Sequence, residues 1–299
     1  MIPDGWAWNQ AELDKNHSLN EGLVSLLAFD RAGSPRVVGS GFFVSAQLDA
    51  AVVCTAAHVL REAERLQQPP TISHPTTLPE FRSQRRELDI SPDSLRVVCV
   101  FGSRVEVANV VWCVLDDTAD FAFIGVEPQP AEPKFTFARE LRFTSRRVNV
   151  GDKMAVIGYN AMSTAPMEPL GQEPRSFQLS RELVLRLGTV TVIHDQGHIL
   201  CRSACFETSV PVSSGMSGSP IVLYTEDGAP SEVVGVICSA PEPDNPDILD
   251  RRVSGCSIAA RLSPELSTLN DAKITAKVRL KSAEVVRKDA APTVITEGT

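Results

Sequence analysis

The chain has 299 residues, of which 43% are hydrophobic and 22% are charged, and this balance excludes a disordered acidic tail, a collagen-like fibre and a low-complexity scaffold. Its 29 Lys and Arg residues against 37 Asp and Glu residues give a net charge of −8, which disfavours a general binder of nucleic acid or anionic membranes. No apolar run reaches the ~18 residues of a membrane span, and the start of the sequence lacks the basic and apolar regions of a secretory signal. We therefore expect a cytoplasmic protein with neither a nucleic-acid nor a membrane partner.

The first part of the chain is predicted to be a polar arm followed by a set of short strands. Residues 1–21 carry Trp6 and Trp8, which we expect to pack on the body of the protein or, alternatively, to anchor a partner. Strand-like runs then alternate with turns as far as residue 133, and one run has helical character. Residues 68–93 are rich in proline and predict a surface loop. The expected strands are 23–29, 36–45, 51–54, 95–101, 104–115 and 121–127, and the expected helix is 56–67.

A proline-rich bridge at residues 128–133 separates this set of strands from a second, comparable set. Many short strands and only one internal helix predict an all-β barrel or sandwich. The two sets favour two barrels, which we place at residues 22–133 and 134–268. The expected strands of the second set are 154–159, 182–193, 198–206, 220–224, 232–238 and 255–260, with a long loop at 161–178.

The end of the chain, residues 269–299, is a locally basic tail on an acidic protein. Residues 273–280 alternate in polarity as an edge strand does. A solvated tail or edge strand is the simpler interpretation, and a docking element for an acidic regulatory partner is the alternative.

The seven cysteines lie mostly inside apolar runs, and we expect free buried thiols in a reducing compartment. Cys201 and Cys205 are four residues apart, as are His194 and His198, so these four residues are an alternative Cys₂His₂ zinc site. Their spacing is poor for known zinc modules, and we therefore expect no metal and no cofactor.

Ser217 is a candidate nucleophile because it lies between Gly215 and Gly218 on a predicted tight turn. Glycines permit backbone torsions that side chains block, and they let a substrate carbonyl come close. Taken alone, such a segment is more typical of a structural turn.

His58 and Asp120 are the candidate partners of this serine. His58 follows a buried strand and precedes a short helix, and an imidazole titrates near neutrality, so it can take and return a hydroxyl proton. Asp120 begins an apolar strand, where its charge needs a partner such as an imidazole. Each residue also has a structural interpretation, His58 as a core residue and Asp120 as a turn or cap.

The three candidates occur in the order His, Asp, Ser, which is the chain order of the chymotrypsin-type triad. Over roughly residues 22–265 the chain resembles trypsin-like (chymotrypsin-fold) serine peptidases, and it is nearer to bacterial and HtrA-like members than to secreted digestive ones. The matching segments are Gly39-Ser40-Gly41-Phe42, Thr55-Ala56-Ala57-His58, Ala119-Asp120-Phe121-Ala122 and Gly215-Met216-Ser217-Gly218-Ser219-Pro220.

This resemblance implies two six-stranded antiparallel β-barrels with the active site between them. Ser217 would attack a peptide carbonyl, His58 would act as base and then as acid, and Asp120 would orient the imidazole. The N–H groups of Gly215 and Ser217 would form the oxyanion hole, where a donor contributes about 3–4 kcal/mol to transition-state stabilisation. The rival acids Asp116 and Asp117 and the rival serines Ser213, Ser214 and Ser219 lack the sequence context of the motifs.

Departures from the family pattern also predict properties. Met216 stands where secreted relatives keep an acidic residue for zymogen activation, so that switch cannot operate here. Val59 replaces a disulfide cysteine, which agrees with a reducing compartment. The expected substrate-binding residues include no acid, which favours a small or medium apolar side chain at the cleaved position. These residues are Pro211, Val212, Cys238, Ser239, Ala240 and Cys256.

The sequence therefore predicts a serine endopeptidase that cuts a restricted set of proteins or peptides in a bacterial regulatory or effector system. One alternative is a catalytically silent binding module on the same fold. Another is a peptidase that stays inactive until a partner orders residues 213–216.

Overall fold

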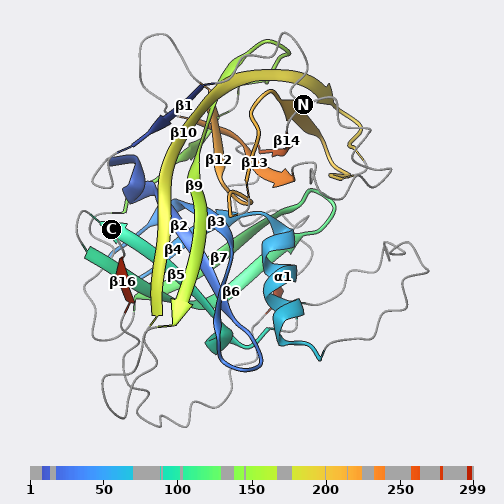
Figure 1. Ribbon diagram of the computed structural model, residues 1–299. Coiled ribbons are helices and arrows are strands. Elements are labelled where there is room, and N and C mark those ends of the chain that lie inside the picture. Colours follow the sequence, from blue (N-terminus) through green and yellow to red (C-terminus); the bar gives the residue numbers. More distant parts are fainter. Residues whose placement is uncertain are drawn as a thin grey trace.

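The computed structural model describes residues 9–13, 18–69, 88, 90–101, 104–128, 138–144, 146–166, 177–198, 200–213, 215–223, 232–239, 257–262, 277–278 and 295–297. Within these residues the chain forms two closed six-stranded antiparallel barrels (Figure 1). The predicted all-β fold with two six-stranded barrels is therefore confirmed.

The first barrel closes in the order β2-β3-β4-β7-β6-β5, and all its pairings are antiparallel. Strands β2 and β7 are buried at nearly every position because one face lines the barrel and the other packs outside it. The strands are β2 (Leu23–Phe29), β3 (Pro35–Ala46), β4 (Ala51–Thr55), β5 (Leu95–Phe101), β6 (Arg104–Asp116) and β7 (Phe121–Pro128).

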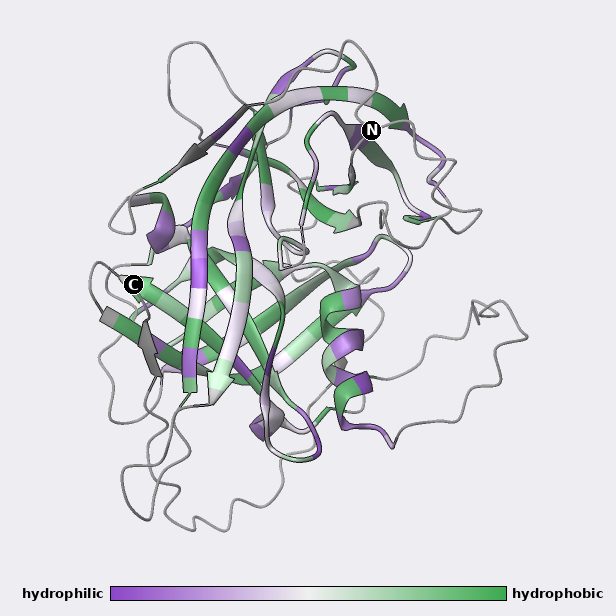
Figure 2. Ribbon diagram, in the orientation of Figure 1, coloured by the Kyte–Doolittle hydropathy of each residue, from purple (hydrophilic) through white to green (hydrophobic). Residues whose placement is uncertain are grey.

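The helix α1 (Ala57–Gln67) begins two residues after β4 and lies against the first barrel. Hydrophobic and hydrophilic residues alternate along it (Figure 2), and Val59, Leu60 and Ala63 join the barrel core. This amphipathic pattern is typical of a helix that covers a barrel with one face. Two short 3₁₀ helices, η1 (Ser18–Gly22) and η2 (Pro92–Ser94), precede β2 and β5.

The second barrel closes in the order β9-β10-β11-β14-β13-β12, again with antiparallel pairings. Part of the expected loop 161–178 is strand, because β9 and β10 stay paired past a bulge between Ser180 and Glu182. The expected strand 198–206 is wrong in its bounds, since most of residues 195–204 form turns before β11. The strands are β9 (Lys153–Pro166), β10 (Phe177–His194), β11 (Cys205–Thr208), β12 (Pro220–Leu223), β13 (Glu232–Ser239) and β14 (Ser257–Arg261).

Four short strands attach segments outside the barrels. The expected arm residues Trp6 and Trp8 lie outside the described residues, as does most of the expected tail. Lys277–Val278, within the expected edge strand 273–280, pairs with β6. The four are β1 (Asn9–Glu12) and β16 (Ile295–Glu297) on β10, β8 (Arg142–Phe143) on β13, and β15 (Lys277–Val278) on β6.

An apolar cluster joins the two barrels. It combines Phe42 and Phe123 of the first barrel with Ile157, Tyr159 and Val236 of the second, all of which are buried. Burial of such side chains is the main favourable term in domain packing. Strands of the two barrels are thereby packed against one another.

The thiols of the described cysteines are free and buried, as predicted. They are Cys54, Cys99, Cys113, Cys201, Cys205 and Cys238, whereas Cys256 lies outside the described residues. Among the helices that the structure describes, none has the length and apolarity to cross a bilayer.

Candidate active site

His58 lies in the first turn of α1, directly after the buried residues Ala56 and Ala57. The helix has no side-chain cap from Ala56. Instead, the His58 N–H group donates to Asp120 Oδ1 at 2.9 Å, so the carboxylate satisfies a backbone donor that the helix leaves unpaired. Negative charge is favourable at a helix N-terminus. One carboxylate thus caps the helix and fixes the backbone of the histidine.

The same carboxylate binds the imidazole ring. His58 Nδ1 lies 2.9 Å from Asp120 Oδ2 and 3.2 Å from Oδ1, and the Asp120 side chain is only 13% exposed. Asp120 has a φ of +48°, a left-handed conformation that aspartate tolerates better than most residues. With Nδ1 held by the carboxylate, Nε2 is the nitrogen that remains for a hydroxyl.

The pKa of His58 is raised above its ordinary value of 6.5. Burial disfavours the imidazolium and opposes this rise, but the charge of Asp120 and its hydrogen bond outweigh burial, and Glu62 adds to them. The protonated ring cannot accept a proton from serine.

We therefore expect the acidic limb of the kcat/KM profile to have an apparent pKa above 6.5. We expect activity to be low below that pH and to rise as His58 loses its proton. A Glu62→Gln variant removes one of the charges that raise the pKa, so its limb is expected at lower pH with the same plateau. Steady-state rates from pH 5 to 9 give the acidic limb of the wild type and that of the variant. A wild-type apparent pKa at or below 6.5 would contradict the assignment of this limb to His58.

The two rival acids have other partners. Asp116 Oδ1 accepts the N–H groups of Thr118 and Ala119 at 2.8 and 3.1 Å, an arrangement typical of an aspartate turn. The Asp117 carboxylate accepts hydrogen bonds from Arg61, from Nε at 3.0 Å and from Nη2 at 2.7 Å. The structure thus brings Asp120, and neither rival, to the imidazole.

The segment that carries Ser217 is bound to the first barrel through Ser40. The Ser40 N–H donates to the Ser217 carbonyl at 2.7 Å, and Ser40 Oγ donates to the Gly215 carbonyl at 2.7 Å. Thr55 Oγ1, three residues before His58, donates to the Ser40 carbonyl at 2.6 Å. These bonds link the Ser217 segment to β4, which ends three residues before His58. In the sequence, Ser40 stands out only as part of Gly39-Ser40-Gly41, and no local signal marks Thr55 as a support.

Gly215 and Gly218 have φ values of +94° and +86°, which explains the need for glycine on both sides of the serine. Within the part of the chain that the structure describes, the N–H groups of Gly215 and Ser217 donate to no protein acceptor, whereas Met216 N–H donates to Ser213. Two unused N–H groups are what an oxyanion hole needs. Among the same residues, no hydrogen bond joins Ser217 Oγ to His58.

The expected substrate-binding residues are placed in part. The Pro211 carbonyl accepts Arg186 Nη1 at 2.7 Å, and Val212 packs on the apolar core of the second barrel. The Cys238 side chain is buried, with its sulfur 3.7 Å from the Asp120 carbonyl. Arg186, a buried cation at this place, was not predicted. The side chain of Ser239 and the whole of Ala240 and Cys256 lie outside the described residues.

Two antiparallel barrels, a histidine bound to an aspartate in one and a serine between left-handed glycines in the other, define the chymotrypsin-like class of protein. A family model for the trypsin-like peptidase domain matches residues 39–236, more than half of the chain. The chain belongs to the trypsin-like peptidase family, as its motifs predict.

Solved structures of similar fold have low sequence identity to this chain. An inactive mutant of Rv3671c from M. tuberculosis H37Rv is 16% identical with a TM-score of 0.45, covering 90% of this chain and 97% of that one. Deg5 is 18% identical with a TM-score of 0.44, and the match covers 83% of this chain and 85% of Deg5. The MamO protease domain from Magnetospirillum magneticum is 14% identical with a TM-score of 0.46, and the match covers 85% of this chain and 99% of that domain. No curated protein matches the sequence.

Proposed function

We propose that the protein is a serine endopeptidase that uses Ser217, His58 and Asp120. The observation that carries this proposal is the double contact of Asp120, which binds both the backbone N–H and the Nδ1 atom of His58. A capping or turn aspartate needs only the first of these contacts. The second contact fixes the tautomer that leaves Nε2 able to accept a proton.

In the proposed reaction, Ser217 Oγ forms a bond to the carbonyl carbon of a peptide while its proton passes to His58 Nε2. The carbonyl oxygen becomes an oxyanion that receives the N–H groups of Gly215 and Ser217. The C–N bond then breaks as His58 returns the proton to the leaving amine. Water, deprotonated by His58, hydrolyses the acyl-enzyme and regenerates the serine.

Covalent labelling of the full-length protein by a fluorophosphonate probe tests this proposal. We expect about one label per chain on Ser217 and none in Ser217→Ala, which should also lose about 10⁶-fold in kcat. Ser219→Ala is the matched control, because Ser219 Oγ is buried two residues away and has no hydrogen-bond partner among the described residues. Equal labelling of wild type and Ser217→Ala, or none in either under every condition, would sink the assignment.

A partner-activated peptidase is the second candidate, and the missing hydrogen bond between Ser217 Oγ and His58 within the described residues favours it. Catalytic hydrogen bonds also often form only when substrate is bound, so both candidates fit the same geometry. A labelling rate that is low for the protein alone and rises sharply with a binding partner would identify regulation. Identical behaviour of wild type and Ser217→Ala in every assay would instead identify a silent binding module.

We also propose that the substrates are a restricted set of proteins in a bacterial regulatory or effector system. None of the expected substrate-binding residues Pro211, Val212 and Cys238 is acidic, which favours small or medium apolar side chains at the cleaved position. N-terminal sequencing of the products of a proteome digest identifies these side chains. Predominant cleavage after Lys or Arg would contradict this part of the proposal.

A further inference from the structure

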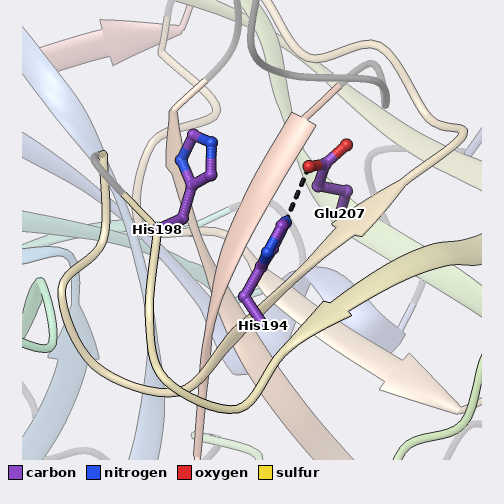
Figure 3. Close-up of side chains that lie close together, drawn as sticks. All are labelled: His194, His198 and Glu207. Atoms are coloured by element: carbon purple, nitrogen blue, oxygen red, sulfur yellow. Dashed lines mark hydrogen bonds and ion pairs between the residues drawn. The ribbon is translucent and has the colours of Figure 1, made fainter.

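His194 and the buried Glu207 form a pair on the second barrel, on the neighbouring strands β10 and β11. In the β-ladder His194 lies opposite Cys205, and Glu207 follows two residues later, so the two side chains share one face and meet diagonally. His194 Nε2 lies 2.7 Å from Glu207 Oε1. Figure 3 marks this contact with a dashed line. The glutamate side chain is only 1% exposed, and that of His194 is 23% exposed. Two rigid strands therefore hold this pair.

His198 brings a second imidazole to the pair from the turn that follows β10. The rings of His194 and His198 have centroids 5.0 Å apart and are tilted by 47°. Reciprocal backbone hydrogen bonds with Cys201, of 2.6 and 3.1 Å, hold His198 in place. One ligand atom from each of His194, His198 and Glu207 lies within 4.8 Å of the other two. The structure thus gathers two imidazoles and one carboxylate at one point (Figure 3).

The two nearby cysteines, which the sequence spacing offered as ligands, make other contacts. Cys201 Sγ faces the Ala119 carbonyl at 3.6 Å, and Cys205 Sγ faces the Cys201 carbonyl at 3.5 Å. The donor set is therefore His₂Glu rather than Cys₂His₂. Glu207 was missed in the sequence because it lies nine residues beyond His198, outside any metal-binding spacing.

We propose that His194, His198 and Glu207 bind a divalent transition-metal ion, with Zn²⁺ as the preferred species. Two imidazoles and a carboxylate with a fourth position for water are a recognised zinc set, and imidazole ligands favour Zn²⁺ over Mg²⁺ or Ca²⁺. Tetrahedral bonds of 2.0–2.1 Å place ligand atoms about 3.3 Å apart. His194 Nε2 and Glu207 Oε1, now 2.7 Å apart, must therefore separate by about half an ångström, and the ligand atom of His198 already lies within 4.8 Å of both residues' ligand atoms.

The ion would compete with contacts that exist without it. It would replace the hydrogen bond between His194 and Glu207, and it would compete with the Leu200 N–H group, which donates to His198 Nδ1 at 3.2 Å. Loss of both bonds lowers the affinity below that of a site with no prior contacts. We therefore expect micromolar rather than picomolar binding.

The site lies at the base of the hairpin that supports the Asp120 turn. Ser203 N–H donates to the Thr118 carbonyl at 3.1 Å, and Cys201 contacts the Ala119 carbonyl. Both acceptors belong to the turn that ends at Asp120. An ion bound between His198 and the strands would fasten this hairpin, so we expect Zn²⁺ to raise the Tm of the protein.

Titration of the metal-free full-length protein with Zn²⁺ alone tests the proposal. Calorimetry should show one equivalent bound with micromolar affinity. His198→Ala and Glu207→Gln should each weaken this binding at least about tenfold, since even indirect metal partners contribute that much. His58→Ala is the matched control: it removes a histidine outside the cluster and should leave zinc binding unchanged.

Two further measurements separate the proposal from misfolding and from a different site. Metal-free His198→Ala should have the circular dichroism spectrum and Tm of the wild type, because His198 lies on a half-buried turn. The Co²⁺-loaded wild type should show the visible bands of tetrahedral cobalt without a sulfur charge-transfer band. Three results would overturn the proposal: no equivalent bound at micromolar Zn²⁺, binding unchanged in a folded His198→Ala variant, or a sulfur band. In each case the His194–Glu207 contact is only a hydrogen bond between neighbouring strands.

Discussion

Asp120→Asn is expected to reduce kcat by about 10⁴-fold while the protein remains folded. Asparagine is as good a helix cap as aspartate, so its Oδ1 atom can still accept the His58 N–H group. Its NH₂ group then faces His58 Nδ1 and stabilises the tautomer that carries its proton on Nε2. An imidazole in that state cannot take the proton of Ser217, so turnover falls although the helix is still capped.

The measurement is kcat on a peptide substrate together with the Tm of the variant. Asp117→Asn is the matched control, because it makes the same change three residues away and affects only the half-exposed pair with Arg61. Partly exposed ion pairs of this kind contribute about 0–1 kcal/mol, so its kcat should stay close to that of the wild type. Equal kcat values for the two variants would remove Asp120 from the mechanism.

Gly218→Ala is expected to destabilise the protein by about 2–5 kcal/mol and to slow fluorophosphonate labelling at least about 100-fold. The φ of +86° at this position disfavours any side chain, and an added Cβ would overlap the Ser40 carbonyl oxygen and Thr55 Oγ1. These two groups bond to each other and hold Ser40, whose N–H and Oγ bind the segment of Ser217 to the first barrel. Relief of the overlap must move Ser217 away from the histidine.

Gly151→Ala separates backbone strain from overlap. Gly151 has an almost identical φ of +87°, but nothing lies within 4 Å of an added Cβ. We expect it to lose only the about 1–2 kcal/mol of the left-handed conformation and to keep its labelling rate. Urea unfolding gives the two free energies, and labelling kinetics give the rates. A Gly218→Ala protein that labels as fast as Gly151→Ala would show that the contact with Ser40 does not position the serine.

The barrels and the candidate site were predictable from the sequence because both depend on local patterns. Alternating apolar runs bounded by turns predicted the strands, and short motifs around His58, Asp120 and Ser217 predicted the site. Strand bounds were less predictable where pairing overrides local composition. The proline-containing residues 161–166 join β9 because β10 pairs with them past a bulge, and no local signal reports this.

Contacts between residues far apart in the chain could not be predicted either. Ser40 is bound to a segment 175 residues away, and no periodicity or spacing reports such a bond. Arg186 and Glu207 read as ordinary charged residues of half-buried strands, yet both side chains are buried. Their surroundings depend on barrel closure, which the sequence specifies only through the whole fold.

The double duty of Asp120 constrains how this chain could evolve. Because one carboxylate both holds the start of α1 and orients the imidazole, most replacements at position 120 would damage folding as well as chemistry. Ser217, by contrast, contributes its carbonyl to the fold and its hydroxyl to no hydrogen bond among the described residues. On the proposed mechanism, descendants released from selection for hydrolysis would therefore be expected to change first at the serine and to retain the acid long after the reaction is gone.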